Sequence, residues 1–395
     1  MSHFELAGFL WAAIGILGLI SVCLLVFGRL GLGSVVAFLV AGIAIGEIRE
    51  IPVQTVTALR EFAELAVILL LFLIGLETEP QQLRRLGRDA LTFGVPQIVL
   101  SALAIGLYAR LGFAGWEAAV VLGLGFALSS TVVVIQLLTD RGELDLPWGR
   151  KAFAILLAQD LAIVPLLLVV SLLAQQESGG GGGTSTWWAI LGALAVVAGI
   201  VIVGRFGLPQ VLARVERQGN QPAFACVTFL GVFAAALAAE TAGLSMALGT
   251  FLLGVILSTS PLGHRIAATV EPVKSVLLAL FFLSVGLGVD LAVLGRAWAP
   301  LLMHTGAILL VKSAVIFGLA MILGLIKTDA VRLSLALIQC GEFGFVLFGV
   351  AQAGGLLSAE LSALASILIM ISMVATPFLV RLGDRIANGT CRDTP

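Results

Sequence analysis

Long apolar stretches, separated by short polar ones, fill almost the whole of this sequence. The hydrocarbon core of a bilayer is about 30 Å thick, so an α-helix needs about 20 apolar residues to cross it. The pattern therefore predicts an all-α polytopic membrane protein with about 13 transmembrane helices. The expected spans cover roughly residues 4–28, 31–46, 59–76, 90–111, 115–139, 148–174, 186–204, 222–240, 243–260, 274–290, 298–325, 331–353 and 358–381.

Composition agrees with this class. Of 395 residues, 60% are hydrophobic and 11% are charged, whereas ordinary soluble domains have about 25% charged residues. No basic cluster interleaved with aromatic residues points to a nucleic-acid partner, and neither a catalytic triad nor a cluster of metal ligands is evident in the sequence. We therefore expect no enzyme, no nucleic-acid binding and no tightly bound cofactor, and we expect the lipid bilayer as the surroundings.

Lysine and arginine are divided unevenly between alternate loops. Short cytoplasmic loops carry the excess of positive charge in membrane proteins. With the N-terminus outside, 17 of the 22 Lys and Arg residues lie in cytoplasmic loops, and Lys312 lies within a span. This distribution predicts an outside N-terminus and a cytoplasmic C-terminus in the cell (inner or plasma) membrane. The first apolar run is too long for a signal-peptide core, so we expect a retained helix.

Two glycines in the first half of the chain each have a counterpart in the second half at nearly the same offset. Gly42 in the second span matches Gly254 in the ninth at an offset of 212, and Gly75 in the third matches Gly286 in the tenth at an offset of 211. Spans seven apart cross the bilayer in opposite directions, so the pattern predicts a six-helix inverted repeat, which is typical of secondary transporters that alternate access. The expected domains are a first repeat at 1–174, a glycine-rich linker and connecting helix at 175–221, a second repeat at 222–385 and a short cytoplasmic tail at 386–395.

Asp160 lies near the middle of the sixth span, where an ionisable residue is costly and therefore marks a functional hypothesis. Gln159 precedes it, and Pro165, five residues later, cannot donate to the carbonyl of Leu161. A carboxylate, an amide oxygen and a loosened carbonyl are the oxygen ligands that monovalent cations require. Burial also favours the protonated form of a carboxyl group. Asp160 and Gln159 are thus predicted to hold a cation or a proton in turn; the alternative is an acid buried in a salt bridge.

Lys312 lies within the eleventh span and Glu342 within the twelfth. One hypothesis makes Lys312 the counter-charge of a carboxylate when no cation is bound. The other makes it a fixed structural cation paired with Glu342 or Asp160. The sequence leaves both open.

The fifth and twelfth spans are seven apart, and polar or small residues interrupt both at mid-depth: Ser129-Ser130-Thr131 in one, Gln339-Cys340-Gly341-Glu342 in the other. Two discontinuous helices at such positions would present helix ends and backbone groups to a central ion. We therefore add Ser130 and Thr131 to the expected ion site and Gln339 to the charge-compensating or structural set. The alternative is that small residues here only allow close helix packing.

Five motifs follow one another along the chain: residues 69–77 (LLLFLIGLE), Gln159-Asp160 followed by Pro165, residues 243–249 (GLSMALG), residues 281–286 (FFLSVG) and residues 341–343 (GEF). In this order they resemble the membrane domain of the Kef-type branch of the cation/proton antiporter superfamily. The resemblance implies a thirteen-helix homodimer, in which a core domain moves against a dimerisation domain and Asp160 is the exchange site. The Gln-Asp pair implies potassium, where sodium-selective relatives have Asn-Asp or Asp-Asp.

Two features depart from the glutathione-gated members of that branch. Those members carry a cytoplasmic nucleotide-binding domain and an acidic loop, whereas this sequence ends shortly after the last span and keeps only Glu271 of that loop. A separate regulatory subunit, or none, is then possible. The expected function is exchange of potassium for protons; the alternatives are sodium/proton exchange on the same scaffold and a gated potassium channel-like efflux protein.

Overall fold

In the computed structural model, residues 3–29, 33–47, 65–66, 68–76, 89–177, 185–242, 244–287 and 291–390 are described, and their regular elements are all helices. The start of the expected third span, Glu77 and most of the glycine run at 178–185 lie outside this part. The labelled helices are α1 (His3–Arg29), α2 (Gly33–Gly46), η1 (Ala90–Gly94), α5 (Val95–Gly112), α6 (Trp116–Ala127), α7 (Thr131–Asp140), α8 (Pro147–Glu177), α9 (Ser185–Ile202), η2 (Val203–Gly207), α10 (Leu208–Arg217), α11 (Gln221–Thr241), α12 (Met246–Ser258), α13 (Gly263–Leu287), α14 (Leu291–Ile322), α15 (Lys327–Ala336), α16 (Phe343–Ala353) and α17 (Ala359–Thr390).

Among the described residues, six helices are long and apolar enough to cross a membrane, and five shorter apolar helices accompany them. The chain is therefore a multi-pass membrane protein, while the count of thirteen spans stays a prediction. The expected fifth span is divided into α6 and α7, and the expected twelfth into α15 and α16. At the C-terminal end, α17 continues to Thr390, so the tail expected at 386–395 begins inside a helix.

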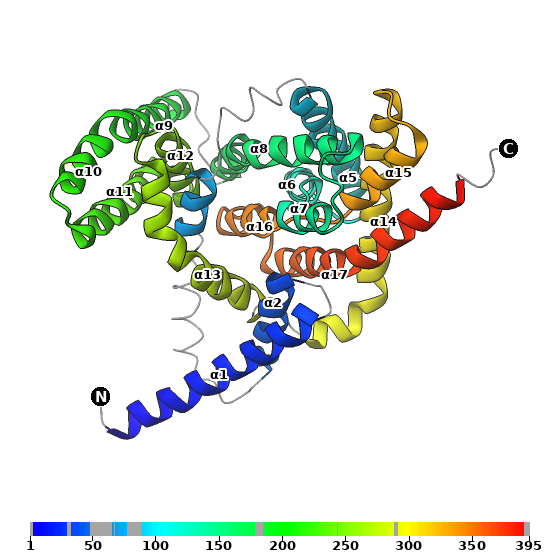
Figure 1. The fold of residues 1–395 in the computed structure, drawn as a ribbon, viewed down its shortest axis with the longest axis horizontal. Helices are drawn as coiled ribbons and strands as arrows, with labels where there is room; N and C mark the ends of the chain where they lie inside the picture. The colour runs from blue at the N-terminus through cyan, green and yellow to red at the C-terminus, as the bar shows by residue number, and fades with distance from the viewer. Residues whose placement is uncertain are drawn as a thin grey trace.

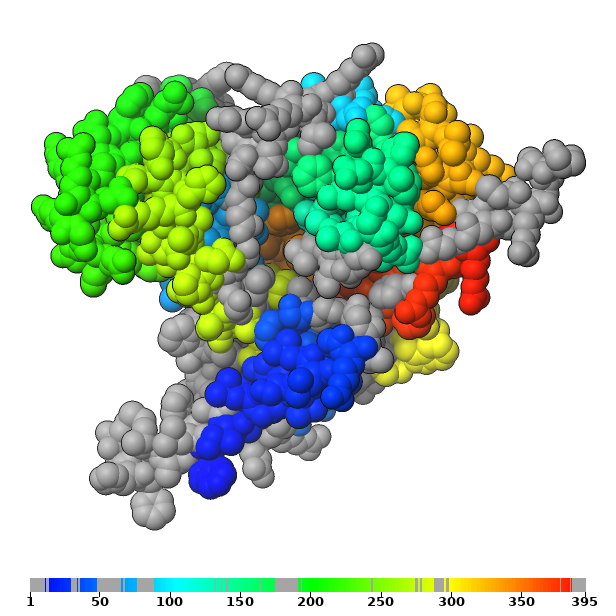
Figure 2. Space-filling view, viewed as in Figure 1, coloured from blue at the N-terminus to red at the C-terminus, as the bar shows by residue number. Residues whose placement is uncertain are grey.

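The helices form two groups (Figure 1). In the core group, which comprises α5–α8 and α14–α17, α5 packs on α6 and α14, α8 packs on α15 and α16, and α17 packs on α14, α15 and α16. In the flanking group, which comprises α1, α2, α9–α13 and residues 68–76, α2 packs between α1 and α13, and α11 packs on α9, α10 and α12. Contacts of α8 with α12 and of α2 with α17 join the two groups. In Figure 2, α9–α12 (green to yellow-green) lie on the left of the view, and α6 and α7 (teal) and α15 (orange) lie on the right.

Glycines bring helix backbones into direct contact at two crossings in the flanking group. Gly42 of α2 lies against Gly286 of α13, and a Cβ added at either would overlap the opposite backbone. Gly75, in the helix at 68–76, lies against Gly254 of α12 in the same way. Such close approach is a common way for helices to pack within membranes. Since Gly42 corresponds to Gly254 and Gly75 to Gly286 in the predicted repeat, each crossing is the counterpart of the other.

Candidate functional site

The first break separates α6 from α7 in the middle of the core group. Helix α6 ends at Ala127, and Leu128 takes an extended conformation (φ −76°, ψ 147°). Ser130 then caps α7, and its side chain accepts a hydrogen bond from the Val133 backbone N–H at 3.5 Å. Serine is a preferred N-cap because its hydroxyl pairs with an N–H that has no partner within the helix. The predicted interruption is thus an actual break between two helices.

The second break separates α15 from α16 and touches the first. Gly341 lies on the backbone of Ser129: a Cβ at Gly341 would come within 2.6 Å of the Ser129 carbonyl. The Gly341 N–H donates to the Leu128 carbonyl at 3.0 Å, and the Ser129 hydroxyl donates to the Leu337 carbonyl at 2.9 Å. The two breaks therefore cross in contact, and the absence of a side chain at Gly341 permits it.

Lys312 reaches this crossing from α14 and is fully buried. Its Nζ donates to the Leu128 carbonyl at 2.6 Å and to the Gln339 carbonyl at 2.7 Å. These carbonyls follow the C-terminal ends of α6 and α15, where the helix dipole is negative. The ammonium group thus bridges both breaks through backbone oxygens, while the carboxylate pairing considered from the sequence stays a prediction.

Asp160 lies on α8, opposite the beginning of α7. The Thr131 hydroxyl donates to Asp160 Oδ1 at 2.9 Å. Thr131 is the first residue of α7, so the carboxylate faces a helix N-terminus, where the dipole favours negative charge. Pro165 lies inside α8, which continues through it, so the Leu161 carbonyl has no N–H four residues ahead to pair with.

Gln159 meets the first break at Ser129, two residues before Thr131, and is completely buried. Its Oε1 accepts from the Ser129 backbone N–H at 2.8 Å, and its Nε2 donates to Gln97 Oε1 at 2.6 Å. Gln97, on α5, donates in turn to the Ala127 carbonyl at 3.1 Å. Gln97 is not among the residues predicted from the sequence, because it neither adjoins an ionisable residue nor interrupts a span. A neutral amide in the middle of an apolar run was the available signal.

Glu342 and Gln339 complete the site from the second break. The Glu342 carboxyl group lies close to the Ser130 side chain, and Gln339 Nε2 donates to the Ser130 carbonyl at 3.5 Å. Two further oxygens, Glu342 Oε2 and Gln339 Oε1, are buried without a hydrogen-bond partner in the described structure. The seven predicted residues therefore gather around the crossing. Ser130, Thr131, Gln339 and Glu342 belong to the two breaks, and Gln159, Asp160 and Lys312 reach them from α8 and α14.

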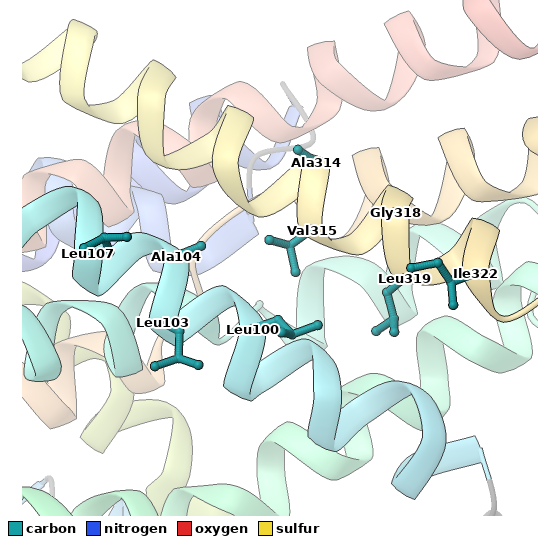
Figure 3. Close-up of a pocket in the computed structure, with 9 residues that line it drawn as sticks. All are labelled: Leu100, Leu103, Ala104, Leu107, Ala314, Val315, Gly318, Leu319 and Ile322. Atoms are coloured by element: carbon teal, nitrogen blue, oxygen red, sulfur yellow. The ribbon is translucent and has the colours of Figure 1, made fainter.

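A groove between α5 and α14 is separate from this site. It has a volume of about 440 Å³, and its lining is apolar, with Leu103 and Leu107 on one wall and Val315 and Ile322 on the other (Figure 3). None of the predicted site residues lines it. Both walls belong to expected spans with exposed apolar side chains, so the groove faces the hydrocarbon region rather than the ion site.

Known proteins share this fold. The structure of the sodium proton antiporter MjNhaP1 from Methanocaldococcus jannaschii at pH 8 superposes with a TM-score of 0.68 at 13% sequence identity, over 96% of this chain and 99% of that one. An electron-microscopy structure of MjNhaP1 gives a TM-score of 0.63 at 14% identity, over the full length of both chains. Residues 16–381 match the family described as "Sodium/hydrogen exchanger, transmembrane". This match covers most of the sequence, and the chain belongs to the transmembrane sodium/hydrogen exchanger family.

Proposed function

We propose that this cation/proton antiporter exchanges sodium for protons, with Asp160 as the group that holds each in turn. The observation that carries this proposal is the position of the Asp160 carboxylate, which accepts the Thr131 hydroxyl where two broken helices cross. A carboxyl group in this place can carry a proton or face a cation, but not both. Mutually exclusive occupancy of one group is the chemical requirement for antiport.

The cation ligands in this proposal are oxygens around the start of α7. The Asp160 carboxylate and the Thr131 hydroxyl supply two, and the Ser130 hydroxyl lies one residue away. The Gln159 oxygen uses one lone pair for the Ser129 N–H, which leaves its second available. Lys312, Glu342 and Gln339 then have a charge-compensating or structural role around the site and do not bind the ion.

Sodium is the first candidate because the family is named for sodium/hydrogen exchange and MjNhaP1 is a sodium proton antiporter. Potassium is the second candidate, and the Gln159-Asp160 pair favours it through its resemblance to the Kef-type branch. Membership of this chain in the Kef-type branch is likewise a proposal. The two cations differ in size and in the strength with which they bind oxygen, so the ligand field around Asp160 decides between them.

Alternating access by an inverted repeat accounts for three arrangements in the structure. The two glycine crossings are counterparts under the predicted offset, and the two broken helices are seven apart in the predicted order of spans. Among the described helices, contacts of α8 with α12 and of α2 with α17 join the core and flanking groups. We propose that the core group moves against the flanking group, which would also supply the contact of a homodimer. The proposed orientation in the cell membrane keeps the N-terminus outside and the C-terminus in the cytoplasm, where a separate regulatory subunit could act.

Purified protein in liposomes tests the function directly. A pH-sensitive dye inside the vesicles should report proton movement when sodium or potassium is added outside, and the Asp160→Asn variant should give no response. Cation uptake that proceeds without proton movement in the opposite direction would establish the channel alternative and refute the antiport proposal.

A further inference from the structure

Two glutamine side chains bridge the gap that the first break leaves in its helix. In an unbroken helix the Ala127 carbonyl would accept from the N–H four residues ahead, and the Ser129 N–H would donate to the carbonyl four residues behind. The break removes both bonds. Gln97 donates to the Ala127 carbonyl at 3.1 Å, Gln159 donates to Gln97 at 2.6 Å, and the Ser129 N–H donates to Gln159 at 2.8 Å.

The direction of this chain of bonds is fixed at both ends by the backbone. The Ala127 carbonyl can only accept, so Gln97 must present its NH2 group there and its oxygen to Gln159. The Ser129 N–H can only donate, so Gln159 must present its oxygen there and its NH2 group to Gln97. Each glutamine amide thus has one orientation that satisfies the Ala127 carbonyl, the Ser129 N–H and the other amide. Turning either amide over would place two donors or two acceptors face to face.

Burial makes this orientation costly to abandon. Gln97 and Gln159 are fully buried, and Ser129 is 1% exposed. A buried polar group without a partner costs about 1–3 kcal/mol. Each glutamine therefore keeps the other in place, because both side chains are shielded from solvent.

We infer that Gln97 is a positioning residue for cation exchange: it orients the Gln159 amide and holds the break between α6 and α7 in the shape that the Asp160 site requires. This inference rests on the proposed function. Gln97 acts through two neighbours: Gln159, which is adjacent to Asp160, and Ala127, which ends α6. Thr131, the hydrogen-bond donor to Asp160, begins α7 on the far side of the same break.

The second break has a donor in the corresponding place. Lys312, on α14, donates to the Gln339 carbonyl as Gln97, on α5, donates to the Ala127 carbonyl. Ala127 and Gln339 are 212 positions apart, which is the offset of Gly42 and Gly254, and Gln97 and Lys312 are 215 apart. The neutral amide of Gln97 therefore holds one carbonyl of the first break, while the charged amine of Lys312 holds one carbonyl of each break. This correspondence argues that Gln97 serves the break, and is not an incidental polar residue.

The test compares Gln97→Leu with Gln97→Glu in liposomes. Leucine has a similar volume but leaves the Ala127 carbonyl and Gln159 Nε2 without partners. A protonated glutamic acid has one O–H donor and one carbonyl acceptor, so it can restore both bonds. We expect Gln97→Leu to raise the KM for sodium about tenfold and to change the sodium to potassium ratio, since one lost buried hydrogen bond is worth up to about a tenfold change in binding. Gln97→Glu should stay within about twofold of the wild type.

Ser101→Ala is the matched control. The Ser101 hydroxyl is the other acceptor for Gln97 Nε2, at 3.1 Å, and it lies outside the bonds that link Ala127 to Ser129. Its loss should leave the KM and the ion ratio unchanged. The double variant Gln97→Leu/Gln159→Leu should show the same ion ratio as Gln159→Leu alone, because Gln97 then has no amide to orient.

A merely structural role predicts a different pattern. Gln97→Leu would then lower the melting temperature and the maximum rate of exchange, while the KM and the ion ratio stayed at wild-type values, and that result overturns the inference. Additive effects in the double variant overturn it as well. Should Gln97→Leu fail to fold, Gln97→Asn, which is one methylene too short to bridge both groups, takes its place with the same expected changes.

Amide hydrogen exchange separates this inference from the proposed function. Peptides that contain residues 127–131 should lose protection in Gln97→Leu and keep it in Ser101→Ala. If wild-type vesicles exchange no ions, the proposed function fails, and the protection of this peptide still decides whether Gln97 orders the break. If wild-type vesicles do exchange ions and the peptide keeps its protection in Gln97→Leu, the inference alone is refuted.

Discussion

Replacing Lys312 by methionine removes a buried charge from the point where the two breaks meet. Methionine keeps the length and apolar stem of lysine but cannot donate to the carbonyls of Leu128 and Gln339, which now accept at 2.6 and 2.7 Å. The Leu128 carbonyl keeps a second donor, the Gly341 N–H at 3.0 Å. The substitution therefore leaves the Gln339 carbonyl as the group that loses its donor within the described structure.

The size of the effect follows from these contacts. One buried carbonyl without a partner costs about 1–3 kcal/mol, while removal of the buried ammonium relieves part of its desolvation cost. We expect Lys312→Met to lower the free energy of unfolding by about 1–3 kcal/mol. Lys312→Gln should lower it by less, because a glutamine amide can still donate to one of the two carbonyls.

Thermal unfolding of the purified protein, followed by tryptophan fluorescence, measures this loss. Lys327→Met is the matched control, since Lys327 is exposed at the beginning of α15, and it should leave the melting temperature unchanged. The dependence of exchange on pH is measured in parallel. A structural Lys312 lowers stability and leaves the pH optimum of the surviving protein in place.

The opposite result would refute this argument. If Lys312 is the counter-charge of an empty carboxylate, its neutralisation leaves an acid that holds its proton more strongly, and the activity profile moves to higher pH. A shifted pH optimum with wild-type thermal stability would show that the two carbonyl contacts contribute little and that charge compensation is the role of Lys312.

Three further predictions concern the same crossing. Asp160→Asn should fold and lose proton-coupled cation flux in dye-loaded vesicles, because the amide keeps the volume of the carboxyl group but cannot carry the proton; flux near the wild-type rate would remove Asp160 from the mechanism. Gln159→Asn should change the sodium to potassium ratio of KM values, because the amide oxygen moves back by one methylene from Ser129; an unchanged ratio in active protein would assign selectivity to other residues. Gly341→Ala should lower the free energy of unfolding by about 1–3 kcal/mol, because its Cβ would overlap the Ser129 backbone. Gly349→Ala is the control and should be tolerated, because Gly349, in the following helix α16, has open space around it. Equal melting temperatures for the two variants would contradict the close crossing.

Local sequence patterns are enough to predict the class of this protein and most residues of its candidate site. Apolar runs of bilayer length determine a helical membrane protein, because every backbone group within hydrocarbon must be paired inside its own segment. Serine, glycine and glutamine in the middle of two such runs marked both breaks. The cost of charge at mid-depth selected Asp160, Lys312 and Glu342. Each of these inferences depends only on the residues of one short stretch of chain and on the lipid that surrounds it, so no long-range contact has to be known.

The tertiary structure decided which groups these residues contact. Lys312 bonds to carbonyls 184 and 27 residues away in sequence, and Gln159 meets Gln97 at a separation of 62 residues. Such partners depend on how helices cross and on which way each side chain projects from its helix. The pairing of Gly42 with Gly286, rather than with its repeat counterpart Gly254, has the same origin.

The same limit explains why the sequence does not point to Gln97 and why it leaves the partners of Lys312 open. A neutral amide in an apolar run carries no sign that distinguishes a structural bond from a functional one. A buried lysine suggests an acid as its partner, because charge pairing is the usual way to offset desolvation. Here two helix C-termini end beside the lysine, and their carbonyls offer negative partial charge without a carboxylate. Only the crossing of the two broken helices creates that arrangement, and a broken helix alone does not reveal where its partner ends.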